Sequence, residues 1–302
     1  MKILLTGGTG LIGRALCRHW AGHGHELIVW SRRAQEVPAL CSGARGVARL
    51  DEIDGSDAPG AVVNLAGAPI ADRPWSSARK KLLWDSRVAL TQALVGWLGS
   101  LPSPPQVLLS GSAAGWYGDS GEQPVDEIDG VAGGSADFGS RLCQAWEDAA
   151  RHAATLGTRV VLLRTASVLA AEGGMLARLR LPFRLGLGGR LGSGRQWLPW
   201  IHLDDAVGLI DFLLRCEDCR GPYNVCAPQP VRNAEFARAL ASALHRPAYL
   251  PVPAWALRLA LGEMSGLLLG GQHLLARRAA EAGYRFHFPD LDAALRDLLV
   301  RR

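Results

Sequence analysis

The sequence predicts an α/β fold: a doubly wound parallel sheet followed by a smaller, mainly helical C-terminal lobe. Short apolar runs alternate with helical patterns over the first 168 residues. A glycine-rich turn joins the first apolar run to the first helical pattern, and the texture of the sequence changes after residue 168. A chain of 302 residues, 48% of them hydrophobic, is long enough for a full α/β domain and a second lobe.

Five apolar runs in the first part predict buried strands. They cover residues 2–5, 26–30, 61–65, 107–110 and 159–163. Helical patterns lie between them, and the last has an apolar stripe at the spacing of a helix face. These patterns cover residues 14–20, 78–98 and 138–156.

The second part has a different texture. Residues 173–199 are rich in Gly, Arg and Leu, which is typical of a loop or hairpin region. Beyond them we expect a helix over 201–214, a strand over 221–225 and mostly helices over 229–302, ending in a well-capped helix that begins near Pro289. The predicted division is a nucleotide-binding domain of residues 1–168 with 200–228 returning to it, and a substrate lobe of residues 169–199 and 229–302.

Composition excludes several classes of protein. The net charge of +5 is spread along the chain without a basic block interleaved with aromatics, so we expect no nucleic-acid partner. No apolar stretch is long enough for a membrane span or an export signal, so we expect no membrane partner, a cytoplasmic location and six reduced cysteines. Cys216 and Cys219 have metal-ligand spacing but no second such pair, and we interpret them as two thiols at a helix end, with no metal site.

The glycine-rich turn has the pattern of a dinucleotide-phosphate loop. Gly7 permits the tight turn, Gly10 puts no side chain between the backbone and a pyrophosphate, and Gly13 lets the helix lie close to the strand. The free N–H groups of the helix N-terminus then face the phosphates. The predicted contacts are Gly7, Thr9, Gly10, Leu11 and Ile12.

The end of the second strand distinguishes between two cofactors. An acidic residue there binds the ribose 2′-hydroxyl of NAD, but this chain has Ser31-Arg32-Arg33. A hydroxyl and a guanidinium would instead receive a 2′-phosphate, so we predict NADP(H), bound by Ser31 and Arg32. The alternative is that these arginines are solvated surface charges.

Three further motifs resemble the extended short-chain dehydrogenase/reductase superfamily, which includes the nucleotide-sugar epimerases and dehydratases. They are Asn64-Leu65-Ala66-Gly67, the stretch Ser110 to Gly118, and Trp200-Ile201-His202-Leu203-Asp204-Asp205. The resemblance implies a Rossmann-type sheet and places the backbone of Leu65, Ala66 and Gly67 beside the cofactor. It also implies that Ser112 is the catalytic serine.

The chain resembles one subgroup more closely along its whole length. Asp85-Ser86-Arg87, Trp146-Glu147, residues 182–189 and the C-terminal block 224–299 are similar to signatures of the "epimerase family" subgroup, sometimes labelled a cell-division inhibitor homologue. This subgroup has its own C-terminal domain.

The chain departs from the superfamily at its Tyr-x-x-x-Lys proton relay, because residues 120–160 contain neither Tyr nor Lys. Two substitutes remain open: Tyr117 as an acid, or Asp137 with Arg141. For Tyr117 the alternative is an aromatic that packs under the substrate lobe. For Asp137 it is a helix N-cap.

Arg87 stands where the superfamily has Asn, and it either contacts cofactor phosphates or an anionic substrate or is solvated. Arg164 either lies near the cofactor or pins the strand end, and His202 and Asp204 are interpreted as structural.

Three functions follow as hypotheses. The first is an NADP(H)-dependent oxidoreductase or epimerase acting on an unknown small polar substrate, with Ser112 and Tyr117 as catalytic residues. The second is a non-catalytic regulator that senses NADPH, which the missing Tyr and Lys favour. The third is an interaction protein with a vestigial glycine loop. A monomer and a homodimer are both compatible with the sequence.

Overall fold

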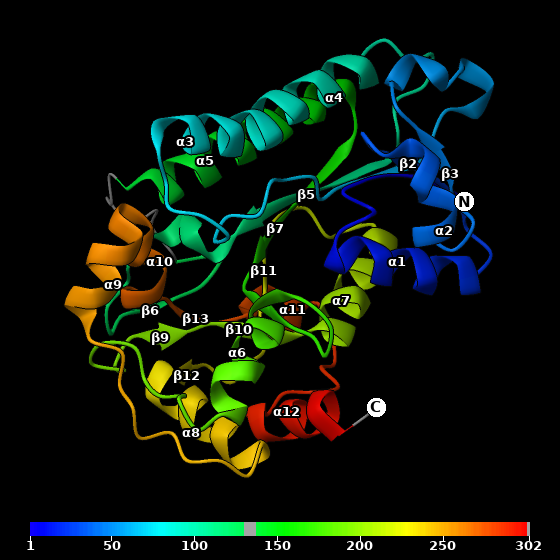
Figure 1. Ribbon diagram of the computed structural model, residues 1–302. Coiled ribbons are helices and arrows are strands. Elements are labelled where there is room, and N and C mark those ends of the chain that lie inside the picture. The colour runs from blue at the N-terminus through cyan, green and yellow to red at the C-terminus, as the bar shows by residue number, and fades with distance from the viewer. Residues whose placement is uncertain (130–136, 301–302) are drawn as a thin grey trace.

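A computed structural model describes residues 1–129 and 137–300. Its centre is a seven-stranded sheet in the order β11-β7-β5-β4-β1-β2-β3, and every neighbouring pair in it is parallel (Figure 1). The fold class predicted from the sequence is thereby confirmed. The strands are β1 (Lys2–Thr6), β2 (Glu26–Trp30), β3 (Arg45–Val47), β4 (Ala61–Asn64), β5 (Val107–Ala113), β7 (Arg159–Thr165) and β11 (Gly221–Val225).

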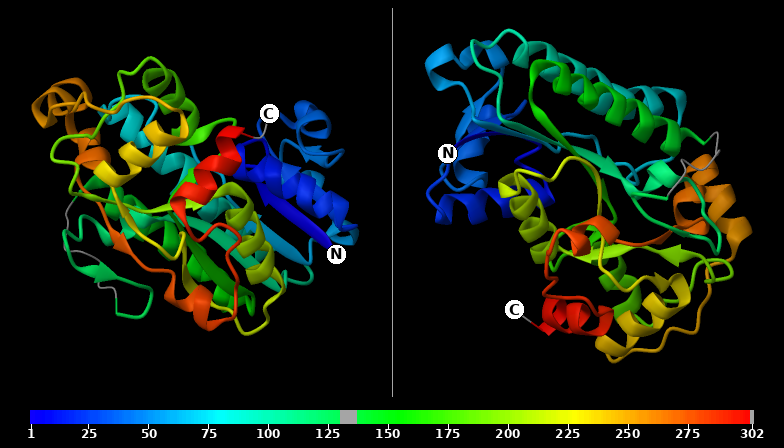
Figure 2. Two further views of the ribbon diagram at one scale, coloured as in Figure 1. Left: turned by 90° about the horizontal axis from the view of Figure 1, so that it is seen from below. Right: turned by 180° about the vertical axis from the view of Figure 1, so that it is seen from behind.

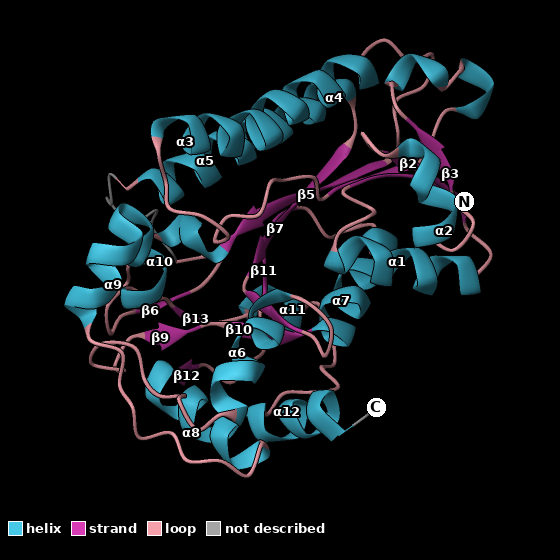
Figure 3. Ribbon diagram, in the orientation of Figure 1, coloured by secondary structure: helices cyan, strands magenta, loops and turns pink. Residues whose placement is uncertain are grey.

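Helices cover both faces of this sheet (Figure 3). Along β1, Ile3 and Leu5 join one core cluster and Leu4 joins the other, as expected for a strand that is buried on both faces. One face is covered by α1 (Leu11–Gly22) and α7 (Leu203–Arg215), and the opposite face by α3 (Ser77–Trp84), α4 (Leu90–Leu98) and α5 (Phe138–Arg151). A π-helical turn, Asp85–Ala89, joins α3 to α4.

The prediction of a loop or hairpin for residues 173–199 is wrong in its first half, because α6 runs from Gly174 to Arg184. Leu176, Leu179 and Phe183 recur at helical spacing and pack into the core of the C-terminal region, which stabilises a helix despite its interior proline. The sequence also gave no sign of β3, a three-residue strand. α2 (Val37–Leu40) precedes it.

The rest of the chain forms a mostly helical region beside the sheet (Figure 2). Its core is made by α6, α8 (Asn233–Ala243) and α12 (Leu291–Val300). The predicted cap of the last helix is present, since the Asp290 carboxylate accepts from Ala293 N–H at 2.8 Å. The remaining α-helices are α9 (Ala254–Leu261), α10 (Gly266–Leu269) and α11 (Arg277–Glu281). The remaining strands form three small pairs: β8 (Ser167–Leu169) with β10 (Trp200–His202), β9 (Trp197–Leu198) with β12 (Val231–Arg232), and β6 (Pro124–Val125) with β13 (His273–Leu274).

Asp205 attaches the end of the chain to the start of α7. Its buried carboxylate accepts from the N–H groups of His287 and Phe288, each at 2.8 Å, and lies 3.3 Å from the Tyr284 hydroxyl. Asp205 is the residue of the Trp200–Asp205 motif that binds this later segment to α7. Within the described residues, no helix has both the length and the apolar character needed to cross a bilayer.

The expectation of six reduced cysteines is wrong for one pair. Cys216 and Cys219 form a disulfide, and Cys17, Cys41, Cys143 and Cys226 are free and buried. The chain turns immediately after α7, where Cys219 N–H donates to Cys216 O at 3.3 Å. This turn brings the two Cα atoms to 5.4 Å, within the range that a disulfide requires.

Candidate functional site

The glycine loop is closed by contacts that only glycine permits. Gly7 has φ +71°, and a Cβ there would lie 2.6 Å from the carbonyl oxygen of Leu65. A Cβ on Gly13 would lie 2.6 Å from Gly8 Cα and would also overlap Gly7 O. The end of β1, the end of β4 and the first turn of α1 therefore meet through backbone alone.

The N-terminus of α1 is open toward the carboxyl edge of the sheet. Its N-cap, Gly10, has no side chain to accept from the first N–H groups, and its first turn has no acidic residue. The N–H groups of Leu11 and Ile12 and the positive end of the helix dipole therefore fit an anionic phosphate. Gly173 and Gly174 lie over this turn, since a Cβ on either would be 3.2 Å from the Leu11 side chain.

A buried polar network shapes the segment that follows β4. The Thr6 hydroxyl donates to Asn64 Oδ1 at 2.7 Å and accepts from Ala66 N–H at 3.0 Å. The Asn64 amide donates in turn to the hydroxyls of Thr91 and Ser110. Thr6 and Thr91 were not identified from the sequence; the only signal was a polar residue at a strand end and another within an apolar helix.

Ser31 and Arg32 lie just beyond the end of β2, on the same edge as the glycine loop. Ser31 Oγ accepts from Arg33 N–H at 3.1 Å, and the Arg33 side chain pairs with Glu36 at 3.1 Å. Arg32 is exposed and has no carboxylate partner among the described residues. Arg32 is therefore the guanidinium available for a 2′-phosphate, whereas Arg33 is engaged.

Ser112, at the end of β5, is held by a fully buried carboxylate. Its hydroxyl donates to Glu147 Oε1 at 2.8 Å, and the Glu147 side chain is 0% exposed. Arg164 donates to both oxygens of the same carboxylate, at 2.8 and 3.0 Å, and Arg151 donates to one at 2.8 Å. From the sequence, Glu147 is identified only as part of a family signature. A Glu among the buried apolar residues of a helix also indicates a carboxylate with several hydrogen-bond partners.

The structure places Tyr117 and Arg164 in the interior. The Tyr117 hydroxyl lies 2.9 Å from Asn224 Oδ1 and 3.0 Å from Asp126 O, and it accepts from Arg164 Nη1 at 3.0 Å. Burial raises the pKa of Tyr117 to about 12, and the Arg164 guanidinium stacks on Trp116 at 3.3 Å from the ring centroid. The polar atoms of both side chains are hydrogen-bonded to other residues of the protein. This favours a packing role for Tyr117 and a role at the strand end for Arg164.

The start of α5 has no proton relay. Asp137 is the N-cap, accepting from Ser140 N–H at 2.8 Å, which favours the structural alternative for this residue also. Phe138 is buried and packs edge-on against Trp75 at 5.2 Å. Cys143 is buried near Arg87, and burial raises the pKa of its thiol to about 12, so the thiol is neutral.

Arg87 lies in the π-helical turn, beside the segment after β4. Its Nη2 donates to Ala68 O at 2.9 Å, and a Cβ on Gly67 would lie 2.9 Å from its Cζ. Its guanidinium lies 5.3 Å from the Trp146 ring centroid, and burial lowers the pKa of Arg87 to about 10. Arg87 is therefore not a solvated surface arginine, and it reaches the same edge of the sheet as Ser112.

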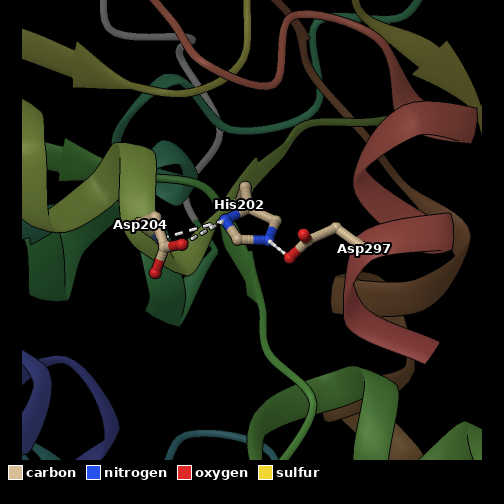
Figure 4. Close-up of side chains that lie close together, drawn as sticks. All are labelled: His202, Asp204 and Asp297. Carbon is tan, nitrogen blue, oxygen red and sulfur yellow. Dashed lines mark hydrogen bonds and ion pairs between the residues drawn. The ribbon is translucent and has the colours of Figure 1, made fainter. Parts of the chain in front are cut away.

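Three ligand-type side chains also meet at His202, as Figure 4 shows. His202 Nδ1 accepts from Asp204 N–H at 3.0 Å, and its Nε2 lies 3.4 Å from Asp297 Oδ2 on α12. The two carboxylates face different ring nitrogens: Asp204 Oδ2 lies 3.9 Å from Nδ1 and Asp297 Oδ2 lies 3.4 Å from Nε2. The arrangement joins α7 to α12 and supports the structural interpretation of His202 and Asp204.

Comparison with known proteins matches both parts of the chain. Residues 3–226 match the model of the NAD dependent epimerase/dehydratase family, and residues 252–298 match a domain of unknown function, DUF1731. The epimerase family protein SDR39U1 of Mus musculus is 39% identical over 99% of this chain and 100% of its own, and YfhF of Bacillus subtilis is 36% identical over 100% and 99%. A crystal structure of the human epimerase family protein SDR39U1 (isoform 2) with NADPH is 35% identical, covers both chains completely and superposes with a TM-score of 0.89.

Proposed function

Because the chain belongs to the NAD-dependent epimerase/dehydratase family, we propose that it binds NADP(H) at the glycine loop. The observation that carries this proposal is the open N-terminus of α1, together with an unpaired Arg32 on the same edge of the sheet. The human relative with a TM-score of 0.89 was crystallised with NADPH, which supports the choice of cofactor.

The residues that would hold the cofactor come from four segments of this edge. Gly7, Thr9, Gly10, Leu11 and Ile12 would receive the pyrophosphate, and Ser31 and Arg32 the 2′-phosphate. The remainder of the cofactor would be lined by Leu65, Ala66, Gly67 and Arg87. We leave Arg164 out of the proposed cofactor site, because its side chain is buried and bound to Glu147. When bound, NADP(H) supplies the hydride donor or acceptor.

We propose further that the chemistry is that of an oxidoreductase or epimerase acting on a small polar molecule. Ser112 is the residue that would contact the substrate, because it stands near the carboxyl end of β5. Its proton is donated to Glu147, so its oxygen would accept from a substrate hydroxyl, and it would donate to a carbonyl only after releasing Glu147. Glu147 holds the Ser112 side chain in place. Tyr117 is not assigned to this chemistry, because its hydroxyl is occupied by three protein groups.

The second candidate function is a regulator that binds NADPH without turnover. The missing Tyr-x-x-x-Lys pair and the buried Phe138 favour it. The two-part division of the chain and a cytoplasmic location remain predictions from the sequence, which is compatible with both a monomer and a homodimer.

Titration of the protein with NADPH and with NADH, followed by calorimetry, tests cofactor binding. We expect NADPH to bind at least about tenfold more tightly, because a charge-assisted contact contributes about 1.5–3 kcal/mol. The variant Arg32→Ala should lose about 10- to 150-fold in NADPH affinity and little in NADH affinity. Arg33→Ala is the matched control, since that arginine pairs with Glu36. Failure of the wild type to bind either dinucleotide would refute the proposal.

Ser112→Ala separates the two candidate functions. NADPH oxidation is measured with a panel of carbonyl compounds and nucleotide sugars. If the protein is an enzyme, turnover of a substrate found with the wild type falls about tenfold or more in Ser112→Ala, while NADPH affinity is kept. Tight NADPH binding by the wild type with no turnover of any compound would favour the regulator.

A further inference from the structure

The helix α9 is apolar and poorly covered by the rest of the chain. None of its eight residues is buried, although its sequence is Ala-Trp-Ala-Leu-Arg-Leu-Ala-Leu. Trp255 and Leu259 are one turn apart and are 69% and 82% exposed. Just before the helix, Tyr249 is 85% exposed. Exposed apolar side chains in such a group mark an interaction surface.

This apolar surface continues onto the end of α6. Residues 184–191 and 246–252 lie side by side, because Arg246 Nε donates to Arg184 O at 3.0 Å and Leu191 pairs with Val252. In Figure 1, α9 lies at the left edge of the molecule and α6 at its lower centre, and the chain that leads into α9 runs along this side of the molecule. We call this surface the α6–α9 face. Its exposed apolar residues are Leu181, Leu185, Leu187, Tyr249, Leu250, Trp255 and Leu259.

The segments that build the α6–α9 face carry positive charge only. Residues 173–203 and 236–262 contain no Asp or Glu and eight arginines. Within the described part of the chain, none of these eight forms an ion pair with a carboxylate. Some arginines elsewhere, such as Arg49 and Arg277, form such pairs, and others, such as Arg32, do not. The eight are Arg178, Arg180, Arg184, Arg190, Arg195, Arg238, Arg246 and Arg258.

The charge of the face selects among the occupants that could cover it. A second copy in a symmetric dimer would bring two sets of unpaired arginines together, which costs free energy. An anionic bilayer complements both properties: its phosphates attract arginines, while Trp, Tyr and Leu enter the boundary between headgroups and acyl chains. The cytoplasmic leaflet is the membrane surface that carries such lipids.

We propose that the α6–α9 face is a docking surface for an anionic phospholipid bilayer. The protein would lie on the membrane surface without crossing it. The sequence lacks a spanning segment, and for that reason we expected no membrane partner. Surface docking needs no such segment, so it differs from that expectation. It does not depend on the proposed cofactor chemistry.

Co-sedimentation with lipid vesicles tests the docking. Vesicles of phosphatidylcholine alone are compared with vesicles of phosphatidylcholine and phosphatidylglycerol, at low and high salt. We expect binding to the mixed vesicles that weakens with salt, and little binding to phosphatidylcholine alone. Arg246→Gln and Arg258→Gln should each weaken binding about fivefold.

The double variant Trp255→Ser with Leu259→Ser should weaken binding to the mixed vesicles at least tenfold. The matched control is Leu82→Ser with Trp84→Ser, two exposed apolar residues on α3, outside the face. Arg49→Gln is the control for the arginines, since it is an exposed arginine far from the face in sequence. Circular dichroism and urea unfolding, measured on every variant, report whether the fold is intact.

Three outcomes would overturn the proposal. One is equal binding to the two kinds of vesicle. Another is wild-type vesicle binding by the Trp255 and Leu259 double variant. The third is retention on a polyglutamate column with no vesicle binding, which would point to an acidic protein partner instead.

Discussion

Glu147 is the residue whose loss should disturb the centre of the molecule most. Its carboxylate is fully buried and receives hydrogen bonds from Ser112, Arg151 and both ends of the Arg164 fork. In Glu147→Leu, the Arg164 guanidinium, whose side chain is 3% exposed, would keep its charge without a counter-charge.

The expected loss of stability is dominated by this unpaired guanidinium. Removal of one partner of a buried ion pair costs about 3–5 kcal/mol. The hydrogen bond from Ser112 adds about 1 kcal/mol, and the half-exposed Arg151 adds less than about 1 kcal/mol. We therefore expect Glu147→Leu to lower the free energy of unfolding by about 3–5 kcal/mol or slightly more.

Urea unfolding followed by tryptophan fluorescence measures this loss. The double variant Glu147→Leu with Arg164→Met replaces both charges with apolar side chains and should be much more stable than the sum of the two single changes predicts. Asp148→Asn is the control, since its 68%-exposed side chain pairs with the same Arg151, and it should change stability by less than about 0.5 kcal/mol. A loss below about 1 kcal/mol in Glu147→Leu would refute the reasoning, because it would mean that Arg164 is not held by this carboxylate.

Three further predictions follow from individual contacts. Gly13→Ala should lower the free energy of unfolding by about 1–3 kcal/mol and weaken NADPH binding, because its Cβ would meet backbone that cannot move aside. Gly22→Ala, in the same helix, has open space around the new Cβ and should change neither property. Thermal unfolding and calorimetry compare the two variants. The pKa of Tyr117, raised to about 12 by burial, and that of Tyr284, raised by burial and by the Asp205 carboxylate, lie above the value of about 10 for an unfolded tyrosine. The stability that these two phenols contribute is present below about pH 10 and is lost as the pH rises through the folded values, so Tyr117→Phe should remove only a late step from the tyrosinate absorbance titration. A thiol assay on the denatured, unreduced protein should count four cysteines, and six after reduction; six before reduction would contradict the disulfide at the end of α7.

The sequence predicted those parts of the fold in which local pattern and tertiary environment agree. The strands of the central sheet are apolar because both faces are buried, so β1, β2, β4, β5 and β7 were all identified. α6 was not, because its glycines and its internal proline are local signals for a loop. Its buried apolar stripe overrides them, and only the packing partners, α8 and α12, show this.

The candidate site was predictable where it consists of backbone and less so where it consists of side chains. A glycine that must approach another chain segment leaves a readable pattern, and Gly7 and Gly13 lie where that pattern placed them. The position of Tyr117 in the sequence, five residues after Ser112, gave no indication of which way its hydroxyl points. Its partner Asn224 is 107 residues away, and such a contact has no local signature.

The π-helical turn between α3 and α4 also affects how this chain should be compared with others. A π turn contains one residue more than an α turn, so the residues after it are rotated by about 100° relative to an uninterrupted helix. A relative without this extra residue would present the same faces on α3 and α4 only if an alignment opens a one-residue gap within Asp85–Ala89. An ungapped alignment would match core positions of α4 with surface positions, and it would assign Arg87 to the wrong counterpart. Likewise, deletion of one residue in this turn would rotate one helix half against the other, whereas a substitution there would keep their phase.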